Sequence, residues 1–312
     1  MQTSKIDSVP SFKKVLLATD FSPASDAAFK TAVRVCTALR ANLVILHVFE
    51  YSDAVPPECG GQLVELDSIY QSALDSLNNA LEIAKKAGIN AEASMKSGMA
   101  ALLILKTIEL TQVDLAILGT NAIHGFERMV FGSTAEEVLR QASCPVLTVG
   151  PRASQPTETF PFGGPVVFAT DFNRTTTPVI RYAASLCEMT KSPLHCLHVL
   201  PRTLETNSQN KIIPQIMTEA LHHVASESGY TIDHPEFAVA YGSEISNAIV
   251  DYARLREAGL IVLGVRQASM IAAHAPVHIA YRVIAEAPCP VLTMAFASRS
   301  SATLAAACFC LT

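Results

Sequence analysis

The chain has 312 residues, of which 50% are hydrophobic and 16% are charged, and its formal net charge is −5. This length exceeds one ordinary domain and suits two, and the apolar content excludes a disordered or fibrous protein. Because the net charge is negative and Lys and Arg gather in no segment, the composition argues against a nucleic-acid-binding protein.

The N-terminal stretch MQTSKIDSVPSFKK lacks the apolar core of a signal peptide. The longest apolar runs, such as residues 43–48, are too short to span a bilayer. We therefore expect a cytoplasmic protein with no membrane partner.

Short aliphatic runs alternate with longer segments of helical periodicity between residues 12 and 150. Apolar strands separated by helices predict a parallel sheet covered on both faces, with ligands at the carboxyl ends of its strands. The predicted strands cover residues 15–18, 43–48, 115–118 and 146–149, and the predicted helices cover residues 26–39, 66–87, 101–110 and 134–142.

An acidic residue, Asp20, directly follows the first predicted strand, and Ser22 and Pro23 then offer an N-cap and a favourable first residue for a helix. A carboxylate at this edge of the sheet can accept hydrogen bonds from a ribose or a base. The alternative is that Asp20 only caps the turn or the first helix.

The segment from Gly119 to Leu139 combines glycines with the start of a predicted helix. Such a segment lets backbone N–H groups approach phosphate oxygens, and Gly132, Ser133 and Thr134 stand where that anion would lie. The competing interpretation is a capping box, because Glu136 stands three residues after Ser133 and the hydroxyl would then serve its own helix.

The second half of the chain repeats the first. The motif A-T-D-F occurs at residues 18–21 and again 151 residues later, whereas D-L-A-I-L-G and C-P-V-L-T recur as G-L-I-V-L-G and C-P-V-L-T at an offset of 145. The repeat predicts two tandem, doubly wound, mainly parallel α/β sheets. We assign a first domain to residues 12–150, a Pro- and Thr-rich linker to 151–164, a second domain to 165–296 and a tail to 297–312.

The order A-T-D-F, L-H-V, D-L-x-x-L-G, G-S-T-A-E-x-V-L and C-P-V-L-T-V resembles the universal stress protein family. The resemblance implies a Rossmann-like fold of the adenine nucleotide alpha hydrolase type, with a five-stranded sheet in each domain, in a tandem two-domain member. In the ATP-binding subgroup a G-x2-G-x9-G-[ST] motif holds the phosphates, and the early Asp with the first two strand ends holds the adenosine. Carried onto this chain, those positions are Ala18, Thr19, Asp20, Val48, Gly119, Ala122, Gly132, Ser133 and Thr134.

The chain departs from that motif at Ala122, which replaces the second glycine. If the position needs a positive φ, an alanine costs about 1 kcal/mol, which lowers affinity without abolishing binding. In the second half only Gly264 survives, because Gln267, Val277 and His278 replace the other motif residues. We therefore expect no ATP there, with Asp171 kept as a turn or cap residue.

Histidines and cysteines are expected to have structural roles. His47 and His198 end apolar strands. Four cysteines lie in apolar periodic segments, as buried thiols do, and two form a C-x-C in the tail, where a metal site is the weaker interpretation. These cysteines are Cys36, Cys144, Cys187 and Cys289, and then Cys308 and Cys310.

These features lead us to expect a stress-response protein whose first half binds ATP, with Mg2+ on the phosphates, and whose second half is structural or regulatory. We expect no dedicated catalysis and at most slow ATP hydrolysis. The resemblance implies that residues 146–149 pair with 291–294, and it leaves homo-oligomers open. The alternatives are an adaptor that binds no nucleotide and a small-molecule carrier using a pocket near Arg266 and His278.

Overall fold

The structure is a computed structural model that describes residues 12–50, 60–120, 123–125, 128–130, 132–153, 162–172, 177–205, 212–227, 235–267 and 277–297. The first half contains β1 (Lys14–Thr19), α1 (Pro23–Leu39), β2 (Asn42–Phe49), α2 (Gly60–Lys86), β3 (Ala91–Ser97), α3 (Ala100–Thr111), β4 (Leu115–Gly119), α4 (Ser133–Gln141) and β7 (Val146–Val149), with a hairpin of β5 (Ile123–Gly125) and β6 (Arg128–Val130) before α4.

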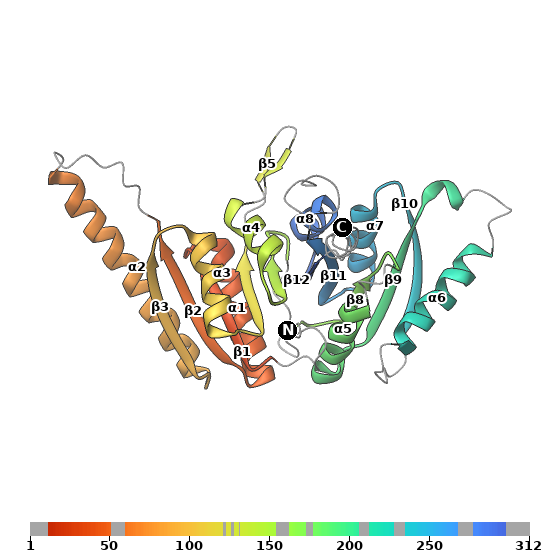
Figure 1. The fold of residues 1–312 in the computed structure, drawn as a ribbon, viewed down its shortest axis with the longest axis horizontal. Coiled ribbons are helices and arrows are strands. Elements are labelled where there is room, and N and C mark those ends of the chain that lie inside the picture. Colours follow the sequence, from red (N-terminus) through yellow and green to blue (C-terminus); the bar gives the residue numbers. More distant parts are fainter. Residues whose placement is uncertain are drawn as a thin grey trace, which may run out of the picture.

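The second half repeats this order. It contains β8 (Val166–Ala169), α5 (Thr177–Thr190), β9 (Leu194–Pro201), the 3-10 turn η3 (Arg202–Leu204), α6 (Ile213–Glu227), β10 (Glu236–Gly242), α7 (Ile245–Leu255), β11 (Leu260–Gln267), α8 (Val277–Glu286) and β12 (Val291–Ala297). Each half forms a parallel sheet of five strands, and the two sheets join edge to edge in the order β10-β9-β8-β11-β12-β7-β4-β1-β2-β3 (Figure 1). The predicted fold class is confirmed.

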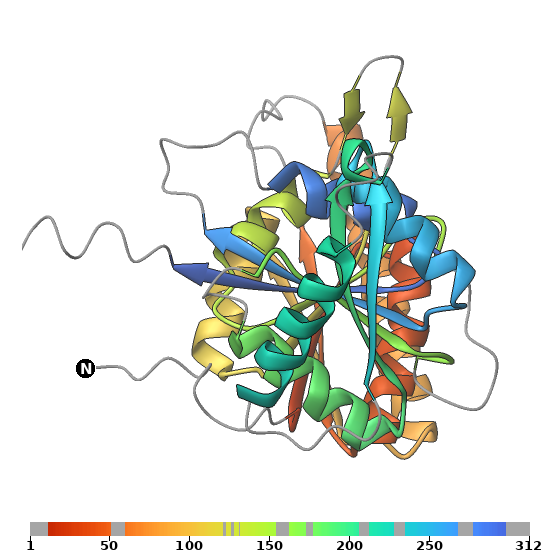
Figure 2. The same ribbon diagram turned by 90° about the vertical axis from the view of Figure 1, so that its right-hand side faces the viewer.

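The helices divide between the two faces of the sheet, as Figure 2 shows from the side. Because successive strand residues point to opposite faces, Leu17 and Ile45 belong to the core cluster that contains residues of α1, α2, α5 and α6, whereas Leu16 and Val44 belong to the cluster that contains residues of α3, α4, α7 and α8. Strands buried on both faces carry apolar residues almost continuously, which is why the sequence located β1, β2, β4 and β7. Within the part of the chain that the structure describes, no helix is both long and apolar enough to cross a membrane.

The sequence analysis did not locate β3. This strand lies at the edge of the sheet and pairs with β2, and its residues AEASMKS are mostly only half-buried. An edge strand with little apolar content gives no continuous hydrophobic run to detect.

The two halves meet where β7 and β12 run antiparallel. The register pairs Leu147 with Leu292, and both side chains are buried at 1% exposure. These two leucines are equivalent under the 145-residue offset of the repeat. Because each leucine pairs with its own equivalent in the other half, a local pseudo-twofold axis passes between Leu147 and Leu292.

The described cysteines are buried and form no disulfide bond with one another, in agreement with the sequence prediction for four of them. Burial raises the pKa of Cys36, Cys187 and Cys289 to about 12 in each case, so these thiols are unreactive near neutral pH. Cys308 and Cys310 lie outside the described residues.

Candidate functional site

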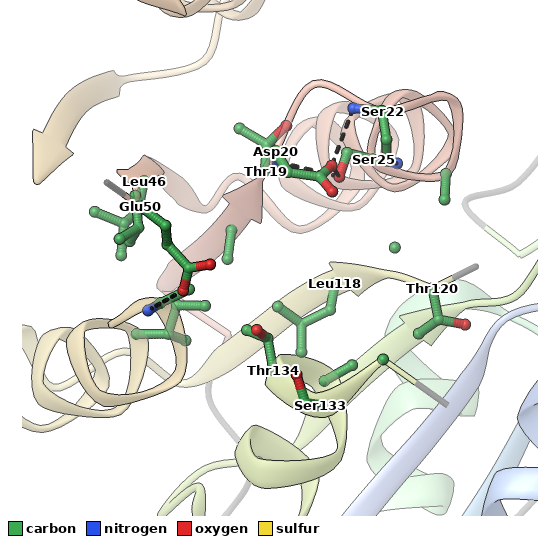
Figure 3. A pocket seen from close by; sticks show the side chains of 18 residues that line it. Thr19, Asp20, Ser22, Ser25, Leu46, Glu50, Leu118, Thr120, Ser133 and Thr134 are labelled. Atoms are coloured by element: carbon green, nitrogen blue, oxygen red, sulfur yellow. Dashed lines mark hydrogen bonds between the residues drawn. The ribbon is translucent and has the colours of Figure 1, made fainter. Parts of the chain in front are cut away.

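A cavity of about 340 Å³ opens at the carboxyl ends of β1, β2 and β4. Three helices, α1, α3 and α4, begin at its rim (Figure 3). Parallel strands place all these strand ends on one edge of the sheet, so residues distant in the sequence converge here.

Eight of the nine predicted site residues line this cavity, namely Ala18, Thr19, Asp20, Val48, Gly119, Gly132, Ser133 and Thr134. The ninth, Ala122, lies outside the described residues. The sequence analysis missed several others that complete the wall, including Ser25, Leu46, Glu50, Ala100, Ile104 and Thr120. Glu50 could have been found by the logic applied to Asp20, because it directly follows a buried strand.

Asp20 organises the turn between β1 and α1. Its Oδ1 accepts hydrogen bonds from the Ser22 backbone N–H at 3.0 Å and the Ser25 hydroxyl at 2.5 Å. Burial raises the pKa of Asp20, but the hydrogen bonds from Ser25 and Ser22 outweigh it and hold that pKa below its ordinary value. The ionised carboxylate thus serves the turn through Oδ1, and Oδ2 makes no hydrogen bond within the described residues.

The N-termini of α1 and α3 each have a side-chain acceptor. Ser22 is the N-cap of α1, and its hydroxyl accepts from the Ser25 N–H at 3.3 Å. Glu50, at the end of β2, accepts from the Ala100 N–H at 2.8 Å and so caps α3 from a neighbouring strand (Figure 3). Both helix ends are therefore partly satisfied by the protein itself.

The part of the chain that the structure describes supplies no such acceptor to the N-terminus of α4. Gly132 is its N-cap, and the first intrahelical hydrogen bond runs from the Glu136 N–H to the Gly132 carbonyl at 2.9 Å. The N–H groups of Ser133, Thr134 and Ala135 therefore have no intrahelical partner. The capping box that was the competing interpretation is not formed, because the helix already begins at Ser133 and the Ser133 side chain is exposed.

Two glycines of the cavity have opposite environments. A Cβ on Gly119 would lie 2.3 Å from the Ala24 carbonyl oxygen, so this glycine lets α1 pack closely on the end of β4. Among the described residues, a Cβ on Gly132 would meet no heavy atom within 4 Å, and the φ of −59° at Gly132 suits any residue. Packing within the described residues therefore explains Gly119, and Gly132 leaves open space in front of α4.

The charged side chains among the described lining residues are two carboxylates, Asp20 and Glu50. Positive potential at the cavity therefore comes from the helix N-termini, above all that of α4. The described residues contain no group of three or more His, Cys, Asp or Glu side chains that could hold a metal ion.

A second cavity of about 480 Å³ adjoins the first and shares Asp20, Val48 and Glu50 with it. Its far wall is α2, which contributes Ile69 and a row of serines. The shared residues lie at the ends of β1 and β2, so the two cavities are neighbours along this edge of the sheet.

The turn after the first strand is the same in both halves. In the first half, Thr19 Oγ1 accepts from the Phe21 N–H at 3.0 Å, and the His47 ring donates from Nδ1 to the Thr19 carbonyl at 2.8 Å. The second half repeats these contacts with Thr170, Phe172 and His198. The two histidines hold the turn, the structural role predicted for them. The loop of residues 268–276 that follows β11 lies outside the described residues.

Comparison with known proteins gives the same family in both halves. The sequence model of the universal stress protein family matches residues 11–150 and again 164–294. A universal stress protein of Methanocaldococcus jannaschii is 30% identical over 140 residues, which cover 44% of this chain and 82% of that protein. A universal stress protein A homologue of Coxiella burnetii is 29% identical over 147 residues, covering 44% of this chain and 96% of that protein.

Solved structures show the same fold over most of the chain. A universal stress protein from Archaeoglobus fulgidus superimposes with a TM-score of 0.65 at 21% identity, covering 90% of this chain and 98% of that one. A protein described as a putative universal stress protein from Pseudomonas aeruginosa gives a TM-score of 0.62 at 15% identity, with coverages of 92% and 94%.

Proposed function

The chain belongs to the universal stress protein family, and from this premise we propose that its first half binds an adenine nucleotide, ATP, in the cavity at the ends of β1, β2 and β4. The observation that carries the proposal is the N-terminus of α4. Among the described residues, α1 and α3 each have a side-chain acceptor at their N-terminus and α4 has none, and the described residues leave the space beside Gly132 open. A helix end of this kind favours a phosphate.

The cavity fits the parts of a nucleotide in order. The N–H groups of Ser133, Thr134 and Ala135 would donate to phosphate oxygens, and the unused Oδ2 of Asp20 would accept from the ribose. The wall between these points is apolar and would take the base, with contributions from Leu46, Val48, Ile104 and Leu118. Because the described residues offer no metal-binding cluster, Mg2+ would be bound through the phosphates.

The proposed role is nucleotide sensing in a stress response, in the cytoplasm, with the second half as a structural or regulatory partner held through β7 and β12. The site gives no reason to propose a dedicated ATPase. Asp20 and Glu50 each use an oxygen to hold backbone N–H groups at helix starts, which ties both carboxylates to structural tasks.

The test begins with nucleotide extraction. Purified protein is denatured, the released nucleotide is identified by chromatography, and ATP binding by the emptied protein is measured by calorimetry. We expect Gly132→Ala to fold normally and to weaken ATP about tenfold, a change of about 1.4 kcal/mol, because its methyl group enters the space before α4. An empty extract together with no calorimetric binding would refute nucleotide binding.

The second candidate function is an adaptor that binds no nucleotide. Two observations favour it: Ala122 replaces a motif glycine, and the charged side chains known to line the cavity are both acidic. The variant Ala122→Gly separates the two functions. If neither the wild type nor this variant binds ATP, the adaptor is the better description.

A further inference from the structure

The second cavity, between α2 and the ends of β1 and β2, has about 480 Å³ and is large enough for a small molecule. The proposed nucleotide uses the neighbouring cavity and leaves the α2 wall of this one without a task. The Phe49 ring, which lines the cavity, meets the ring of Tyr70 on α2 edge to face, with centroids 5.6 Å apart. The helix is therefore packed against the end of β2, and we call the space between them the α2 cavity.

His47 offers a hydrogen-bond acceptor in the wall of the α2 cavity. The residue is only 8% exposed, and its Nδ1 lies 2.8 Å from the Thr19 carbonyl oxygen. Because a carbonyl can only accept, Nδ1 carries the proton, and a neutral imidazole then has its lone pair on Nε2. Nε2 has no hydrogen-bond partner within the described residues and is not sealed from solvent. The ring can therefore accept a hydrogen bond from a molecule in the cavity.

The α2 helix supplies a second acceptor from the far wall. Ser72 and Ser76 lie one helical turn apart, and both line the α2 cavity. The Ser76 hydroxyl donates its proton to the Ser72 carbonyl at 2.9 Å. Because that proton is already used, the Ser76 oxygen has only lone pairs to offer a ligand, as His47 Nε2 does.

Two carboxylates line the α2 cavity where it adjoins the nucleotide cavity. The pKa of Asp20 lies below its ordinary value, so this carboxyl group is ionised near neutral pH. Glu50 uses Oε1 to accept from the Ala100 N–H, and its Oε2 makes no hydrogen bond or ion pair within the described residues. The described lining residues include no Lys or Arg. The α2 cavity is therefore rich in acceptors and in negative charge.

The second half separates what the fold requires from what is particular to the first half. The Phe21 ring stacks on His47 with centroids 4.8 Å apart, and the second half repeats this contact at His198. The stack therefore belongs to the fold. Glu50 follows His47 by three residues, and Pro201 stands at the equivalent position after His198. The fold of the turn thus does not require a carboxylate at the end of this strand.

We propose that the α2 cavity binds an organic primary ammonium ion. An ammonium group has three donors and no acceptor, which matches a wall whose free polar groups accept hydrogen bonds and whose charges are negative. The rings of Phe21 and Phe49 provide aromatic faces that attract a cation, and Val48 and Ile69 would pack against its carbon chain. This site is separate from the proposed nucleotide site and does not depend on it.

The first test compares probes of equal carbon number that differ in charge. The full-length chain without nucleotide is titrated with butylammonium, 1-butanol, erythritol and butanoate, and binding is followed by NMR. We expect butylammonium to bind about tenfold more tightly than 1-butanol or erythritol, and butanoate not to bind, because the carboxylates attract a cation and repel an anion. Equal affinity for butylammonium and 1-butanol, or tighter binding of erythritol, would overturn the proposal.

The His47 ring reports where the ammonium ion binds. In long-range 1H–15N spectra, butylammonium should move the Nε2 resonance of His47, whereas Nδ1, which is bonded to Thr19, should change little. His198 is the internal control, because its Nδ1 makes the same contact with the Thr170 carbonyl at 2.8 Å in the second half. A His47 Nε2 resonance that stays fixed at saturation, or that moves no more than that of His198, would contradict the site.

Variants of α2 and β2 give the last readout. Ser72→Leu should weaken butylammonium about tenfold, because the larger side chain fills the cavity. Asn79→Leu is the matched control at an exposed position of the same helix outside the described cavity lining, and it should leave binding unchanged. Circular dichroism checks that both variants fold, and butylammonium binding that survives Ser72→Leu would refute the site.

Glu50→Gln distinguishes this site from the nucleotide site. Loss of the negative charge should weaken butylammonium about threefold to fivefold, whereas the same variant should tighten ATP. Unchanged butylammonium affinity in this variant would count against the ammonium site. If the wild type binds no ATP, the proposed function fails, and the butylammonium titrations still decide whether the α2 cavity binds a cation.

Discussion

Replacing Gly119 by Ala should destabilise the protein even without a ligand. The added Cβ would lie 2.3 Å from the Ala24 carbonyl oxygen, 2.5 Å from its carbon and 2.7 Å from the Ser25 nitrogen, whereas ordinary contacts begin at 3.4 Å. All three atoms are backbone, so no side chain can turn away and the start of α1 must shift by about 1 Å to relieve the overlap. Overpacking of this kind costs about 1–3 kcal/mol.

Urea denaturation followed by circular dichroism measures this change, and Gly132→Ala is the matched control. The same methyl group at Gly132 meets no heavy atom of the described residues within 4 Å, so it should lower the free energy of unfolding only through the weaker N-cap preference of alanine, by at most about 1 kcal/mol. With an m-value of about 3 kcal/mol/M, Gly119→Ala should lower the midpoint by about 0.3–1 M. Equal midpoints for the two variants would refute the close packing of α1 on β4.

Three further variants test the turn after β1, the cavity, and the contact between β7 and β12. Asp20→Asn should lower the free energy of unfolding at pH 7, and urea titrations should show a smaller difference from the wild type at pH 3. The pKa of Asp20 is lower in the folded state than in the unfolded state. The stability that the ionised carboxylate contributes is therefore complete above the unfolded pKa and is lost as pH falls through the folded pKa. Glu50→Gln keeps an acceptor for the Ala100 N–H but removes a negative charge from the cavity, so calorimetry should show ATP binding about twofold to fivefold tighter, and weaker binding would contradict the placement of the phosphates. Leu147→Ala should lower the free energy of unfolding, measured by urea denaturation, by about 2–4 kcal/mol. A loss below about 1 kcal/mol would mean that β7 and β12 are not tightly packed around Leu147.

The sequence predicted the strands well where both faces of a strand are buried. Strands covered on both faces, such as β1 and β4, are continuous apolar runs and are recognisable without any structure. The edge strand β3 is half-buried and mixed in composition, so pattern alone did not locate it. The start of α2 at Gly60, six residues before its predicted start, was missed for a similar reason, because GGQLVE carries no clear apolar period.

Site residues were predictable where their position beside a predicted strand end or helix start indicates their role. Asp20 follows a strand, and Gly132 and Ser133 begin a helix, so all three could be placed at one sheet edge from the order of elements. The capping role of Glu50 could not be predicted, because its partner, the Ala100 N–H, is fifty residues away in the sequence. A cap supplied by a neighbouring strand has no local signature, unlike the Ser22 cap of α1.

The amino-acid sequence by itself determined the duplication, the alternation of strands and helices, the family and most of the cavity wall, because these follow from local periodicity and from motifs repeated at a fixed offset. Tertiary structure decided which helix start is left open. Ser133 and Glu136 satisfy the pattern of a capping box, yet Gly132 is the N-cap of the helix and its carbonyl accepts from the Glu136 N–H. The residue at which α4 begins depends on how the helix packs in the core that it shares with other elements, and that packing cannot be read from the four residues that form the motif.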